Sequence, residues 1–219
     1  MIPFTVDQFL NVFEQYNVAV WPAQVFLYTI GIVAICLALS RQKDFSRSIS
    51  LILSLFWIWM GIVYHLSFFS AINKAARGFA ALFVLQGILF FIAGVSKHQL
   101  TFRFSSNLYG IVGGVFLVYA LIFYPAFGYW LGHRYPAAPT FGLPCPTTIF
   151  TFGILLWTIR RVPLYILAIP LAWSFIGGWA AISLGMIEDF GLLVAGLLGS
   201  MLIIFRDTSI PQVSAKPTA

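Results

Sequence analysis

Long apolar runs that carry almost no charge constrain this chain more than any other feature of its sequence. An α-helix needs about 20 apolar residues to cross the hydrocarbon layer of a bilayer. Only 8% of the residues are charged, and most of the runs lack the polar face that a soluble helix shows at helical period. We therefore predict an all-α, polytopic membrane helix bundle with seven transmembrane helices, at residues 20–40, 49–70, 77–96, 106–130, 146–160, 162–183 and 187–205.

The basic residues lie in short loops between these runs and predict the orientation. If the N-terminus is outside, nine Lys and Arg residues fall on the inner side and three on the outer side, which follows the positive-inside rule. We expect a protein of the cell (inner) membrane, N-terminus outside and C-terminus cytoplasmic. Six spans with one re-entrant segment is the alternative. The inner group is Arg41, Lys43, Arg47, Lys97, Arg103, Arg160, Arg161, Arg206 and Lys216.

Residues 1–18 form the first of three expected parts of the chain. Thr5 and Gln8 have the spacing of a capping box, and Phe9 and Phe13 belong to one apolar face, so we predict an amphipathic helix on the outer membrane surface. An ordinary packed N-terminal helix is the alternative. Residues 19–206 are the expected seven-helix membrane domain, and residues 207–219 the expected flexible inner tail.

A proline-rich segment, "LGHRYPAAPTFGLPCPTTIFTFG" (residues 131–153), separates two apolar runs. The helical run from Thr147 to Ile159 has 13 residues, which makes about 20 Å of helix, shorter than the ~30 Å hydrocarbon layer. We therefore expect Pro136 to Pro146 to be a non-helical, re-entrant outer loop before the fifth helix, lining an outward-facing pocket. A rigid cap without a ligand is the alternative.

The same segment resembles the signature of a known family. "GHRYPAAPTFG" followed by "PCPTTIFTFG" is similar to the signature region of an uncharacterised family of bacterial multi-pass integral membrane proteins, a domain of unknown function. The resemblance implies a membrane location. It implies no activity, so the function must be argued from the residues themselves.

Polar side chains are rare in the predicted spans and gather toward the outer end. Gln86 is the only amide deep within a span, so a mid-membrane proton relay is not expected. The candidate substrate-binding residues are His65, His133, Arg134, Cys145, Thr147, Thr148, Glu188 and Asp189. A divalent metal, the one cofactor considered, would take His65, His133, Glu188 and Asp189. Each residue also has a simpler interpretation as an interfacial anchor or a helix cap.

Three functions remain open from the sequence. The first is binding or transport of a small solute or ion through the outer pocket. The second is a metal-dependent membrane hydrolase of a lipid-like substrate, similar in outline to ceramidase-like hydrolases but without their paired histidines on the last span. The third is a structural or assembly protein without a ligand. The expected partners are the lipid bilayer, a small ligand and further copies of the chain, with no nucleic acid.

Overall fold

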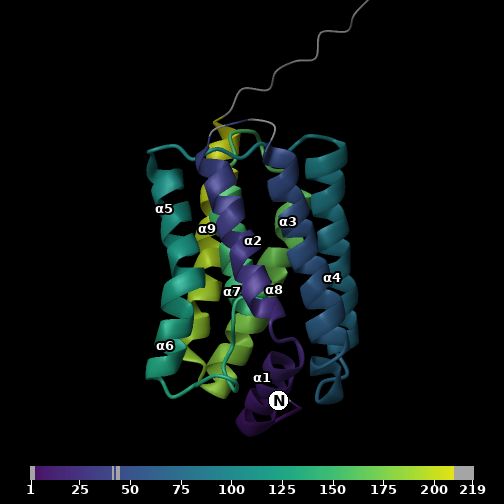
Figure 1. The fold of residues 1–219 in the computed structure, drawn as a ribbon. Helices are drawn as coiled ribbons and strands as arrows, with labels where there is room; N and C mark the ends of the chain where they lie inside the picture. The colour runs from purple at the N-terminus through teal and green to yellow at the C-terminus, as the bar shows by residue number, and fades with distance from the viewer. Residues whose placement is uncertain (1–2, 41, 43–44, 210–219) are drawn as a thin grey trace, which may run out of the picture.

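The computed structural model describes residues 3–40, 42 and 45–209, and within them the fold is all-helical (Figure 1). The long helices run side by side as a bundle, with α1 at one end and the end of α9 at the other. The all-α prediction is confirmed for these residues. The helices are α1 (Val6–Ala19), α2 (Ala23–Leu39), α3 (Phe45–Trp59), α4 (Ala76–Phe90), α5 (Leu108–Val118), α6 (Tyr124–Trp130), α7 (Pro144–Leu156), α8 (Leu164–Leu184) and α9 (Phe190–Thr208).

Five helical stretches in the described part of the chain are long and apolar enough to cross a membrane. Short π-helical turns at Met60–Leu66, Phe91–Ser96 and Tyr119–Phe123 lengthen α3, α4 and α5. A sixth stretch passes the same test if α1 and α2 count together, although they meet at a bend of 87°. Among the described residues, length and composition alone therefore give five or six spans, and the predicted count of seven is not confirmed. The five are Phe45–Ala71, Ala76–Ser96, Leu108–Trp130, Leu164–Leu184 and Ile187–Thr208.

The helix that departs from the prediction is α7. It has 13 residues, too few for a span, and all of them except Cys145 are buried. It packs against α5, α8 and α9 and forms the centre of the bundle. The predicted non-helical loop ends at Leu143, because Pro144 and Pro146 lie in the first helical turn. Proline suits that turn, where its missing N–H and fixed φ cost nothing.

The proline-rich connection is fixed to the end of α1. Asn17 donates through Nδ2 to the carbonyl oxygens of Pro136 and Ala138, both at 2.7 Å, and accepts at Oδ1 from the Thr140 hydroxyl at 2.9 Å. The predicted capping box of Thr5 is present. The apolar face of α1 is buried on the bundle, so α1 is packed against protein through this face.

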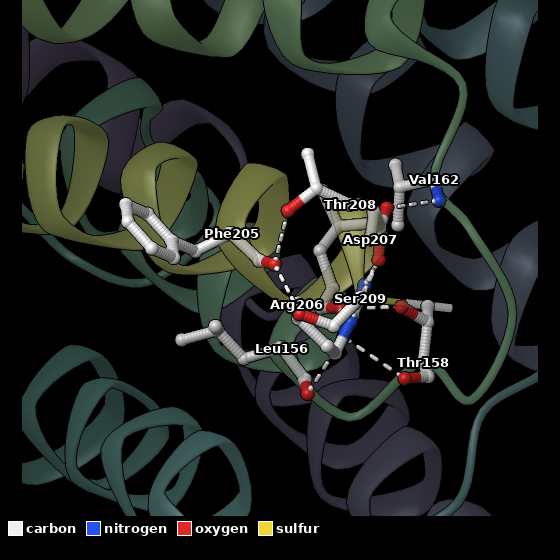
Figure 2. A network of polar contacts seen from close by, with 9 residues as sticks. Leu156, Thr158, Val162, Phe205, Arg206, Asp207, Thr208 and Ser209 are labelled. Carbon is white, nitrogen blue, oxygen red and sulfur yellow. Dashed lines mark hydrogen bonds and ion pairs between the residues drawn. The ribbon is translucent and has the colours of Figure 1, made fainter. Parts of the chain in front are cut away.

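The opposite end of the bundle is held by Arg206 of α9 (Figure 2). Its Nη1 donates to the carbonyl oxygens of Leu156 at 3.2 Å and Thr158 at 2.9 Å, which close the C-terminal end of α7. Asp207 pairs with Arg206 Nη2 at 2.8 Å and accepts from the Val162 N–H at 2.7 Å. Because α9 continues through Thr208, the helix runs past the expected limit at residue 206. Most of the expected tail, residues 210–219, lies outside the described residues.

Two further contacts set the distances between helices in the core. The Gln86 side chain donates through Nε2 to the Ile166 carbonyl at 3.0 Å, which ties α4 to α8. At Gly113 the backbone of α5 approaches α7 so closely that a Cβ there would lie 2.7 Å from the Gly153 carbonyl oxygen. Helices in lipid approach in this way through small residues.

Candidate functional site

A cavity of about 360 Å³ opens at the α1 end of the bundle. It lies among α1, the turn that follows α3, the start of α4, the middle of α8 and the proline-rich connection. Most of its wall is apolar, because aromatic side chains line it from the α1 region, the turn after α3, α4, α6 and α8, and the proline-rich connection adds Pro139 and Leu143. The aromatic residues that line it are Phe4, Phe9, Phe13, Tyr64, Phe69, Phe79, Tyr124, Trp173 and Trp179.

Three polar side chains meet at one place in this wall. Asp189, just before α9, is 4% exposed and lines the cavity. The Tyr124 hydroxyl at the start of α6 donates a hydrogen bond to Asp189 Oδ1. The Cys145 thiol in the first turn of α7 also lies close to Asp189, without forming a well-aligned hydrogen bond. The Trp173 indole N–H approaches the Cys145 sulfur without forming a well-aligned bond.

The two adjacent acids have different partners. Glu188 is fully buried and its Oε1 lies 2.6 Å from His133 Nδ1, so these two side chains are paired. The Tyr119 hydroxyl donates to the Glu188 carbonyl oxygen at 2.8 Å and fixes the backbone here. Asp189 has only neutral donors, and within the described part of the chain it forms no ion pair. Among the described residues the Asp189 carboxyl group therefore has no cationic partner, and it lines an aromatic cavity.

His65 lies apart from these acids. It is fully buried, and neither ring nitrogen has a hydrogen-bond partner. Its neighbours are aromatic rings, among them Phe83 at 4.5 Å and Trp173 at 5.0 Å between ring centroids. It does not line the cavity, although Trp173 does.

Of the four predicted metal ligands, the structure joins only His133 and Glu188 as a contacting pair. Among the described residues no three His, Cys, Asp or Glu side chains gather where they could hold an ion. This geometry gives no support to a divalent metal at the α1 end. The remaining acid, Asp189, instead contacts a tyrosine and a cysteine.

The other candidate residues have local roles. Arg134 is exposed, with its guanidinium 5.2 Å from the centre of the Tyr129 ring. Thr147 is buried, and its Oγ1 accepts from the Gly142 N–H at 3.0 Å, which holds the connection onto α7. Thr148 is buried with an unpartnered hydroxyl. None of these three lines the cavity, whereas Cys145 and Asp189 do.

Sequence reasoning missed Tyr124 and Trp173. Both lie inside apolar runs, where an aromatic residue is ordinary, and neither belongs to a recognisable motif. The predicted pocket was polar, but this cavity is aromatic with one polar corner. The cavity is more apolar than predicted because α1 and the turn after α3 contribute phenylalanines to its lining. No local sequence pattern predicts that these segments meet.

Comparison with known proteins places the chain in one family. Residues 6–213 match the model of a "Family of unknown function (DUF6064)". No curated protein and no solved structure matches the chain. Because the match covers nearly all of the sequence, the chain belongs to this family.

Proposed function

We propose that this member of the DUF6064 family is a multi-pass protein of the cell membrane that binds a small, apolar organic cation in the cavity at its α1 end. The N-terminus and this cavity face outward, on the basis of the nine-to-three distribution of basic residues. The observation that carries the proposal is Asp189, a nearly buried carboxylate with neutral partners at the wall of an aromatic cavity.

The chemistry of that wall selects for a cation. An ionised carboxylate inside a membrane protein is expensive unless it is paired with a cation or protonated. Aromatic faces attract a cation electrostatically by about 0.5–2 kcal/mol, and they also accept an apolar body. A quaternary or tertiary ammonium group with an apolar substituent satisfies both requirements, whereas a hydrated metal ion would lose its water against phenyl rings.

The shape of the bundle favours binding over an open channel. The cavity volume of about 360 Å³ falls within the range of about 300–1,000 Å³ that is typical of small-molecule sites. Cys145 lines the cavity, and the residues of α7 that follow it are buried among other helices. A solute could pass to the opposite end only if α7 moved.

A matched pair of probes tests the proposal. Purified protein in neutral-lipid nanodiscs would be titrated with benzyltrimethylammonium and with neopentylbenzene, its neutral isostere, while thermal unfolding is followed. A ligand of the folded state at 100 times its Kd stabilises by about 2.7 kcal/mol. We expect the cation to raise the unfolding temperature and the isostere to have a much smaller effect.

The variant Asp189→Asn should remove the difference between the two probes, with at least a tenfold loss of affinity for the cation. Glu14→Gln is the control, because Glu14 is an exposed acid on α1 outside the cavity. Equal binding of both probes to the wild type, or unchanged cation binding by Asp189→Asn, would overturn the proposal.

A further inference from the structure

A second cavity, of about 400 Å³, lies at the end of the bundle opposite α1. It is formed where the start of α3, the segment after α4 and the segment after α7 meet. Its lining includes Arg47, His98, Thr101 and Arg160, so it is polar and basic where the first cavity is aromatic. The three elements are distant in the sequence, and the fold alone brings Arg47 and Arg160 together.

His98 holds the two arginines in place. Arg47 Nε donates to His98 Nδ1 at 3.1 Å, and Arg47 Nη2 lies 2.8 Å from His98 Nε2. Arg160 Nη1 donates to the His98 carbonyl oxygen at 3.2 Å. His98 has a φ of 51°, an uncommon conformation for a residue with a side chain. This backbone turn directs the imidazole to one arginine and the carbonyl to the other.

No acid offsets this charge in the described part of the chain. Neither Arg47 nor Arg160 forms an ion pair there, and Asp207, an acid at the same end, is engaged by Arg206 and the Val162 N–H. Both arginines are exposed, and among the described residues each makes its side-chain hydrogen bonds to His98 alone, which leaves further N–H donors available. Two guanidinium groups around one cavity, with no acid paired to either of them among the described residues, favour the binding of an anion.

We propose that this cavity binds a phosphate group, held between Arg47 and Arg160 with the Thr101 hydroxyl beside them. The planar guanidinium donates two parallel hydrogen bonds to phosphate oxygens, and such charge-assisted bonds are about twice as strong as neutral ones. The cavity lies at the ends of the membrane helices, the level of lipid headgroups. A phospholipid headgroup and a soluble phosphate compound both offer this chemistry. The proposal is independent of the aromatic cavity.

General basic bias is the competing explanation, because Lys and Arg accumulate at the cytoplasmic ends of membrane helices whether or not they bind anything. The chain supplies its own control. Lys97 is exposed next to His98 but does not line the cavity, and Arg103 is exposed at the same end and lines a different one. Removing these two charges changes the net charge by the same amount without touching the proposed site.

Two binding measurements on detergent-purified protein test the proposal. One arm counts bound phosphatidylglycerol by native mass spectrometry. The other titrates inorganic phosphate and glycerol 3-phosphate calorimetrically. Each arm compares wild type, Arg47→Gln with Arg160→Gln, and the control Lys97→Gln with Arg103→Gln. Saturable binding in at least one arm should weaken tenfold or more in the first double variant and less than twofold in the control.

The outcomes separate the two sources of phosphate. Saturable binding in the lipid arm alone assigns a headgroup, and saturable binding in the calorimetric arm assigns a soluble phosphate compound. His98→Asn, which keeps a residue type that tolerates a positive φ but removes the imidazole, should weaken the same arm several-fold. No saturable binding in either arm, or an equal loss in both double variants, would overturn the proposal.

Discussion

Replacing Arg206 with methionine should weaken the contacts between α9 and the C-terminal end of α7, the helix at the centre of the bundle. The Arg206 side chain is 10% exposed, and its guanidinium donates to the carbonyl of Leu156, the last residue of α7, and to that of Thr158 just after the helix (Figure 2). The last carbonyls of a helix have no partners within it. Methionine keeps an apolar stem of similar length but removes every donor. The change leaves the Leu156 and Thr158 carbonyls without these bonds and deprives Asp207 of its cation.

The expected cost can be worked from these contacts. Hydrogen bonds to charged groups contribute about 1.5–3 kcal/mol each. Two bonds to Arg206 Nη1, at 3.2 and 2.9 Å, are short enough to count fully, whereas the 3.4 Å contact to the Leu155 carbonyl adds little. Breaking one partner of a buried ion pair costs about 3–5 kcal/mol, and slight exposure moves the value to the low end. The two estimates overlap, because both describe the loss of the same guanidinium group, so they are not added; the low end of either one gives a loss of about 3 kcal/mol in the free energy of unfolding.

Thermal unfolding in detergent or nanodiscs measures this loss. For a chain of this size, 1 kcal/mol corresponds to about 2–4 °C, so Arg206→Met should lower the unfolding temperature by about 6–12 °C. Arg103→Met is the matched control, because Arg103 is an exposed arginine at the same end whose backbone N–H, rather than its side chain, bonds to the Trp157 carbonyl. If the two variants unfold within 2 °C of each other, the anchoring role of Arg206 is wrong.

Three further predictions concern the fold and its orientation. Gly113→Ala should lower the folded fraction in size-exclusion chromatography, because its Cβ would lie 2.7 Å from the Gly153 carbonyl oxygen; Gly114→Ala, with 3.9 Å to its nearest neighbour, should behave like the wild type. Asn17→Ala should speed hydrogen exchange across 137–143 by freeing two carbonyls and the Thr140 hydroxyl, whereas the exposed Asn11→Ala should not. In a background without Cys36 and Cys145, an impermeant maleimide should label Asp7→Cys in intact cells and miss Lys97→Cys; the reverse pattern would place the aromatic cavity inside.

The long helices were predictable because length and apolar content alone decide them. The run expected at 77–96 is the stretch Ala76–Ser96, and the run at 187–205 lies within Ile187–Thr208. The role of α7 was harder to predict. In a membrane a helix is apolar whether it faces lipid or protein, so periodicity does not separate a lipid-facing span from a fully enclosed helix. Its shortness was visible between Thr147 and Ile159, but its central position was not.

The candidate site was predictable in part for a similar reason. His133 and Glu188 are polar residues near the same predicted end of two helices, and the structure pairs them. His65 has no such signal, because its partners are aromatic rings that could lie anywhere in an apolar run. Tyr124 approaches Asp189 only through the packing of α6 against the turn before α9, which depends on the whole fold.

The enclosure of α7 has a consequence for how the chain is made. A helix of 13 apolar residues is too short to be held by lipid alone, and its end carbonyls need partners that hydrocarbon does not offer. Those partners belong to Arg206, near the end of α9, which is synthesised after α7. We therefore expect α7 to reach its final depth only after α9 has entered the membrane. In a nascent chain stopped before residue 206, the C-terminal end of α7 would lack its contacts with Arg206, and α7 would not yet be packed at the centre of the bundle.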